Sequence, residues 1–169
     1  MKDIVLIGMP ACGKTMFGKM LAQSLNREFF DADEVLEQRE KRSIKSFFAE
    51  SEAAFREAET RTLKFLSDKD GVVIATGGGA VLSELNMKML SENGIVIFID
   101  RRPEKVLASI VGDSRPLLAE DKQRVFDLYS ERIELYRKYA DYIVDNNGMP
   151  EDTFDQLVRI WDRIRENLD

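Results

Sequence analysis

Apolar residues follow two alternating patterns along the chain. Short runs rich in β-branched residues predict strands at residues 4–7, 29–31, 72–75, 95–99 and 142–144. Longer stretches with apolar residues at helical spacing predict helices at residues 14–25, 32–40, 44–49, 52–66, 84–91, 104–111, 122–139 and 151–167. Because strands alternate with helices, the pattern predicts an α/β protein, a three-layer sandwich with a five-stranded parallel sheet between helices.

The residues that follow the predicted strands indicate where a ligand would bind. In parallel α/β sheets ligands bind outside the carboxyl ends of the strands. Gly8, Asp31, Thr76 and Arg101 lie at or just beyond strand ends, so we expect them around one crevice. The segment 112–123, GDSRPLLAEDKQ, contains Gly and Pro and is polar at both ends. It is a candidate for a mobile flap, although a surface loop without a role fits the same composition.

Length and composition indicate one globular domain spanning residues 1–169, with 44% hydrophobic and 33% charged residues. The apolar runs are far shorter than the roughly 20 residues of a membrane-spanning helix, and the amino terminus lacks a signal-peptide cleavage site. We therefore expect a cytoplasmic protein without a membrane partner. A formal charge of -6 argues against nucleic-acid binding, so an anionic ligand would need a local cationic pocket.

Cysteine and histidine counts exclude several kinds of site. The chain has no histidine and a single cysteine, Cys12. It therefore lacks the residues for an internal disulfide, a Cys/His metal cluster or a nucleophile activated by histidine.

The stretch GMPACGKT, residues 8–15, fits the P-loop pattern between a predicted strand and a predicted helix. Gly8 and Gly13 allow backbone N–H groups to converge on phosphate oxygens at the positive end of the helix. Lys14 would reach the β- and γ-phosphates, and the Thr15 hydroxyl would be a Mg²⁺ ligand. We interpret Cys12 as a small loop-filling residue rather than a redox group. The expected ATP-binding residues of this loop are Gly8, Ala11, Cys12, Gly13, Lys14, Thr15 and Met16.

Three further features are candidates for the rest of a site. Asp31 and Asp33 in FFDADEV follow a short strand, where an Asp that caps the next helix is the simpler interpretation. Three consecutive glycines, Gly77, Gly78 and Gly79, follow a buried strand and would let a small polar ligand approach the backbone. Arginines recur in segments expected near the crevice, although each alone also fits a solvated helix charge. They are Arg56, Arg115 and Arg132.

The motifs GMPACGKT, FFDAD, SIKSFFAESEAAFREAE, VIATGGGAVL, DSRPLL and ERIELYRKYAD follow one another between residues 4 and about 160. In these motifs and their order the sequence resembles the shikimate kinase family. Many families share the P-loop, whereas the combination of DAD, FRxxE, TGGGA and RPLL is specific.

The resemblance implies a P-loop fold like that of nucleoside monophosphate kinases and transfer of the γ-phosphate of ATP to the 3-hydroxyl of shikimate, with Mg²⁺. It implies catalytic roles for Lys14, Asp33 and Arg115, of which Arg115 lies in the flap and contacts ATP. Helices within residues 32–66 would bind the substrate, and Thr15 and Asp31 would hold the metal. The implied shikimate ligands are Asp33, Arg56, Gly77, Gly78, Gly79 and Arg132.

Some alternatives remain open on the sequence. Asp100, after four apolar residues, resembles a Walker B carboxylate and competes with Asp31 for the metal. The family often has a basic residue beside adenine where this chain has Ala108 and Ser109. Another small-molecule kinase, such as a gluconate kinase, and a catalytically silent nucleotide-binding module are the rival functions. The lack of an obvious apolar surface stripe favours a monomer.

Overall fold

The computed structural model describes residues 1–110 and 122–166. Five parallel strands form one sheet in the order β2-β3-β1-β4-β5. Their bounds are β1 Asp3–Ile7, β2 Phe29–Asp31, β3 Val73–Ala75, β4 Gly94–Asp100 and β5 Tyr142–Asp145. The predicted five-stranded parallel sheet is therefore confirmed, with strand ends that differ from the expected ones by at most one residue.

The helices also follow the predicted order. Their bounds are α1 Lys14–Leu25, α2 Ala32–Glu40, α3 Ile44–Glu50, α4 Glu52–Ser67, α5 Glu84–Asn93, α6 Pro103–Ile110, α8 Lys122–Tyr139 and α9 Pro150–Glu166. A 3-10 turn, η1 at Ala80–Leu82, was not predicted. The predicted helix ends at residues 111 and 167 lie outside the described residues, as do residues 112–121 of the expected flap.

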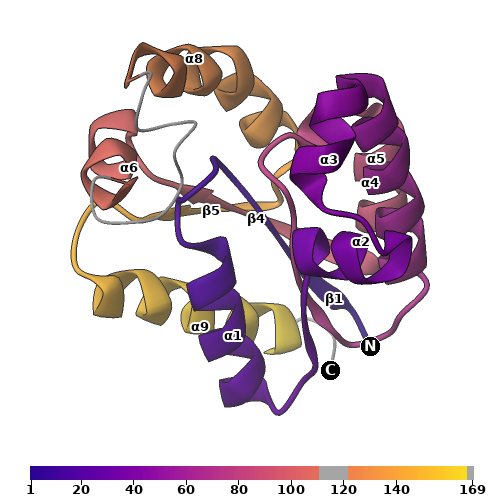
Figure 1. The fold of residues 1–169 in the computed structure, drawn as a ribbon. Helices are drawn as coiled ribbons and strands as arrows, with labels where there is room; N and C mark the ends of the chain where they lie inside the picture. Colours follow the sequence, from indigo (N-terminus) through magenta and orange to yellow (C-terminus); the bar gives the residue numbers. More distant parts are fainter. Residues whose placement is uncertain (111–121, 167–169) are drawn as a thin grey trace.

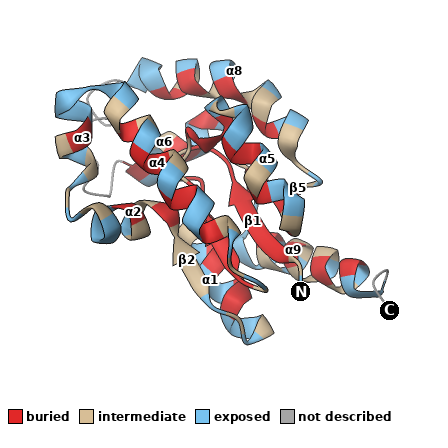
Figure 2. Ribbon diagram, turned by 90° about the vertical axis from the view of Figure 1, so that its right-hand side faces the viewer, coloured by how far each residue is buried: buried red, intermediate tan, exposed pale blue. Residues whose placement is uncertain are grey.

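Helices cover both faces of the sheet. In Figure 1, α1 and α9 lie side by side below the strands, whereas α5 and α8 lie on the other side. All five residues of β1 are buried, as the red central strand in Figure 2 shows. This burial explains the near-continuous apolar sequence of the central strands, since neither face of such a strand meets water.

Helices α2, α3 and α4 pack together beside the main core. Leu36, Phe47, Phe55 and Ala58 form a small buried cluster of their own between these helices. Serines begin two of the helices, because the Ser43 and Ser51 hydroxyls accept the N–H groups of Ser46 and Ala54. The arrangement brings one face of α4 toward the segment that follows β3.

Within residues 1–110 and 122–166, no helix is both long and apolar enough to cross a bilayer.

Candidate active site

The loop between β1 and α1 has a backbone that requires glycine at both ends of its motif. Gly8 has φ 147° and Gly13 has φ 105°, both in the region that side chains rarely adopt. A Cβ atom at Gly8 would also lie 2.7 Å from the carbonyl oxygen of Ile99 on β4. The loop therefore runs close to the end of β4, and its two motif glycines have backbone conformations that other residues rarely adopt.

The first turn of α1 is suited to an anion. Among the described residues, no side chain caps this helix, and its first turn contains no acidic residue. The N–H groups of a helix's first turn lack partners within the helix and carry partial positive charge. Lys14 adds a cation: its ammonium donates to the carbonyls of Gly8 and Met9 at 2.8 and 2.7 Å, and the residue is only 7% exposed.

The other predicted loop residues differ in their accessibility. Cys12 is fully buried, and its carbonyl accepts the side-chain amide of Asn146 at 2.8 Å. Ala11 adopts a left-handed conformation with φ 59°. Met16 is 48% exposed on the outer side of α1. Burial agrees with the interpretation of Cys12 as a residue that fills the loop.

Thr15 and Asp31 meet at the carboxyl ends of β1 and β2. The Thr15 hydroxyl donates to Asp31 Oδ2 at 2.6 Å, while Asp31 Oδ1 accepts the N–H groups of Asp33 and Glu34 at 3.0 and 3.4 Å. Asp31 is therefore the helix cap that the simpler interpretation suggested, and it also contacts the hydroxyl expected to bind a metal. A hydroxyl beside a carboxylate is a donor set that suits Mg²⁺.

Asp100, the rival carboxylate, is engaged elsewhere. Its Oδ1 accepts the hydroxyl of Tyr129 at 3.0 Å. Burial, followed by this hydrogen bond, raises the pKa of Tyr129 to about 12, so the phenol remains a donor. Asp31, rather than Asp100, is the carboxylate that contacts the Thr15 hydroxyl.

The three glycines connect the P-loop to the helices on the other side of the crevice. A Cβ atom at Gly77 would lie 3.0 Å from both Asp33 Oδ1 and Glu59 Oε2. One at Gly78 would lie 2.6 Å from Cδ of Pro10, and one at Gly79 would collide with the guanidinium group of Arg56. A side chain at Gly78 would clash with Pro10, and one at Gly77 or Gly79 would crowd the charged side chains beside it, which gives each of the three glycines a packing reason.

Charged groups gather beside the glycines. Arg56 Nη1 donates to Glu59 Oε1 at 2.9 Å, and Glu59 is only 3% exposed. Burial raises the pKa of Glu59, while the charge of Arg56 opposes the rise. Arg132, on α8, is 8% exposed. Within the described residues, Arg56 Nε, Glu59 Oε2 and Arg132 Nε are buried without a hydrogen-bond partner.

Buried polar atoms without a hydrogen-bond partner lower the stability of the folded protein unless a bound ligand supplies the missing partner. Asp33 and Arg56 lie beside the glycines, and Arg132 lies close enough to Glu59 for its charge to act on that carboxyl group. Arg115, the remaining predicted catalytic residue, lies outside the described residues.

A family model described as shikimate kinase matches residues 10–162. The chain belongs to the shikimate kinase family. A shikimate kinase from Clostridium botulinum strain Eklund 17B is 40% identical over 157 residues, covering 93% of this chain and 95% of the relative.

Solved structures of the family have the same fold as this chain over nearly its whole length. A shikimate kinase from Acinetobacter baumannii in complex with shikimate aligns with a TM-score of 0.88 at 34% identity, covering 99% of this chain and 94% of that one. The shikimate kinase from Aquifex aeolicus aligns with a TM-score of 0.80 at 37% identity, covering 92% and 94% of the two chains. The P-loop kinase fold predicted from the sequence is therefore confirmed.

Sequence reasoning missed some residues of the site. Glu59 is the last residue of the quoted FRxxE motif, but no role was predicted for it, although its spacing from Arg56 places both on one helix face. Asn146 lies in DNNGMP, whose composition carries no comparable signal. Its amide links that loop to the P-loop carbonyl of Cys12.

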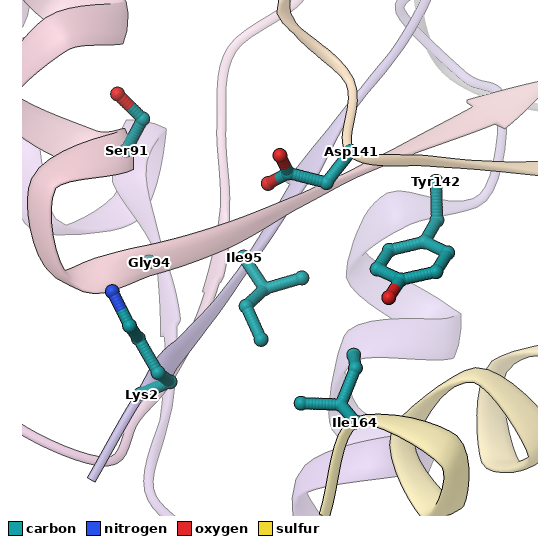
Figure 3. A pocket seen from close by; sticks show the side chains of 7 residues that line it. All are labelled: Lys2, Ser91, Gly94, Ile95, Asp141, Tyr142 and Ile164. Carbon is teal, nitrogen blue, oxygen red and sulfur yellow. The ribbon is translucent and has the colours of Figure 1, made fainter. Parts of the chain in front are cut away.

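A cavity lies at the opposite end of the sheet from the P-loop. It has a volume of about 370 Å³ and is lined by Lys2, Ser91, Gly94, Ile95, Asp141, Tyr142 and Ile164, as Figure 3 shows. Asp141 Oδ2 already accepts the N–H of Val96 at 2.8 Å, and the Lys2 ammonium donates to the carbonyl of Glu92 at 3.3 Å. Because its charged groups are satisfied and the strands begin here, this cavity is not the candidate site.

Proposed function

We propose that the protein transfers the γ-phosphate of ATP to the 3-hydroxyl of shikimate, giving shikimate 3-phosphate and ADP. The observation that carries the proposal is the set of unpaired buried atoms on Arg56, Glu59 and Arg132. These atoms belong to residues that surround three glycines, and the middle glycine rests on Pro10 of the phosphate loop. A phosphate donor bound by the P-loop and a polar acceptor bound beside the glycines would therefore lie next to each other.

The charges of the acceptor side suit a small hydroxylated acid. Guanidinium groups form two parallel hydrogen bonds with a carboxylate, and Arg56 and Arg132 would bind the shikimate carboxylate in this way. Carboxylate side chains accept hydrogen bonds from hydroxyl groups, a role open to Asp33. The backbone of Gly77, Gly78 and Gly79 would lie against the ring.

Asp33 would act on the reacting hydroxyl. As the substrate oxygen attacks the γ-phosphorus and the bond to the ADP oxygen breaks, the hydroxyl proton would pass to the Asp33 carboxylate. Lys14 and Arg115 would stabilise the negative charge on the transferring group. Gly8, Ala11, Cys12, Gly13, Thr15 and Met16 would surround the phosphates.

Mg²⁺ would be the required metal, with Thr15 and Asp31 as its protein contacts. The contact of 2.6 Å between their oxygens supports this choice, because a hard cation prefers such ligands. The ion would supply positive charge that neutralises the phosphate oxygens. We further propose that the enzyme works in the cytoplasm as a monomer, with ATP and shikimate as its partners.

Identification of the product tests this function. The purified protein is incubated with Mg-ATP and shikimate, and the products are analysed by mass spectrometry and phosphorus NMR. A shikimate monophosphate whose phosphorus couples to the proton at C3 is the expected product. Inorganic phosphate alone, or phosphate on another hydroxyl, would contradict the assignment.

A further inference from the structure

Tyr136 is a fully buried tyrosine that reaches the glycines from α8, one helical turn beyond Arg132. Its ring stacks on Phe98 of β4, with centroids 5.0 Å apart. Its hydroxyl donates to the carbonyl oxygen of Gly78 at 2.6 Å, across 58 positions of the chain. The aromatic ring thus belongs to the core, while the hydroxyl has a separate partner.

The bonded carbonyl differs from its two neighbours. The carbonyls of Gly77 and Gly79 accept the N–H groups of Ala80 and Leu82, the first and last residues of η1. The carbonyl of Gly78 instead accepts a side-chain hydroxyl, that of Tyr136. In a trans peptide the carbonyl and the following N–H point in opposite directions, so a fixed Gly78 carbonyl also fixes the N–H of Gly79. Glycine on both sides offers little resistance to rotation of this peptide.

This peptide lies between the two halves of the site. Gly78 rests on Pro10 of the P-loop, and Gly79 faces the guanidinium group of Arg56. Within residues 1–110 and 122–166, the N–H groups of Gly78 and Gly79 have no hydrogen-bond acceptor. They therefore remain available to a ligand bound beside Arg56, provided that the peptide keeps its orientation.

We propose that Tyr136 is a positioning residue, whose hydroxyl locks the peptide between Gly78 and Gly79 so that the Gly79 N–H faces the acceptor substrate. The inference rests on the proposed function. Burial raises the pKa of the Tyr136 phenol, while Arg132 opposes the rise, and the hydroxyl therefore stays protonated as a donor near neutral pH. Without it, the partly buried carbonyl would lose this partner and the peptide could turn its carbonyl toward the substrate carboxylate.

The test compares Tyr136→Phe with Tyr139→Phe. The first change keeps the ring that stacks on Phe98, and the second removes a hydroxyl from the same helix whose contact is with Lys138. The loss of this partly buried hydrogen bond predicts a rise of about 10-fold in the shikimate KM of Tyr136→Phe. The KM for ATP should change less than about twofold, and Tyr139→Phe should match the wild type.

A second readout needs no substrate. In nitrogen-15-labelled Tyr136→Phe, the amide resonance of Gly79 should shift from its wild-type position because the peptide changes orientation, whereas that of Val5 in β1 should not. A purely structural role would lower the melting temperature and affect both KM values alike.

Equal shikimate KM values in the two variants would overturn the inference, as would equal effects on both substrates or a Tyr136→Phe protein that does not fold. A wild-type protein without shikimate-dependent turnover would instead overturn the proposed function and the inference with it. The two failures are therefore distinguishable.

Discussion

Replacing Arg132 by alanine should weaken shikimate binding while leaving ATP binding nearly unchanged. The side chain is 8% exposed, and its Nε has no partner among the described residues. A hydrogen bond to a charged group contributes about 1.5 to 3 kcal/mol. Loss of the contact with the shikimate carboxylate should therefore raise Kd by about 10- to 150-fold.

Isothermal titration calorimetry with shikimate measures this change directly. Arg132→Lys should fall between the wild type and the alanine variant, because lysine keeps the charge but not the planar pair of donors. Arg137→Ala is the matched control: this arginine lies on the same helix, is 51% exposed and pairs with Glu134 at 2.9 Å. Unchanged shikimate affinity in Arg132→Ala would refute the assignment of this arginine to the substrate.

Three further changes test other parts of the site. Lys14→Ala should lower kcat by about 100-fold or more, since one charge-stabilising donor is worth that much, as steady-state ADP release would show. Asp33→Asn should lower kcat by about 100-fold or more while calorimetry shows near-normal ATP binding; near-normal turnover would exclude the proton role. Burial raises the pKa of Glu59 from its ordinary 4.5, against the opposing charge of Arg56. The folded state therefore holds this proton more tightly, and the free energy of unfolding should fall as pH rises from 4.5 through the raised pKa. Urea unfolding at several pH values should show a larger fall in the wild type than in Glu59→Gln, and parallel pH profiles would contradict it.

Much of the fold could be predicted because its signals are local. The range of α1, Lys14–Leu25, and that of β2, Phe29–Asp31, match the predicted ranges. The turn η1 was missed because three glycines followed by three small or apolar residues show neither helical nor strand periodicity. Strand ends shifted by one residue, since pairing with a neighbouring strand decides where a ladder stops.

The site could be predicted only in part, because only some of its contacts lie within one continuous stretch of sequence. The P-loop is a continuous sequence with its own backbone geometry, and its glycines carry the positive φ angles that the motif requires. By contrast, Tyr136 meets Gly78 across 58 positions, and Asn146 meets Cys12 across 134. No local pattern marks such contacts, because they arise only when the strands and helices pack together.

ADP release from the purified protein with Mg-ATP tests the central claim most directly, measured with shikimate, with gluconate, with quinate and without an acid. The account predicts slow ADP release without an acid, and a large increase with shikimate but not with gluconate or quinate. Release at one rate under all four conditions, or an increase with gluconate instead, would contradict it.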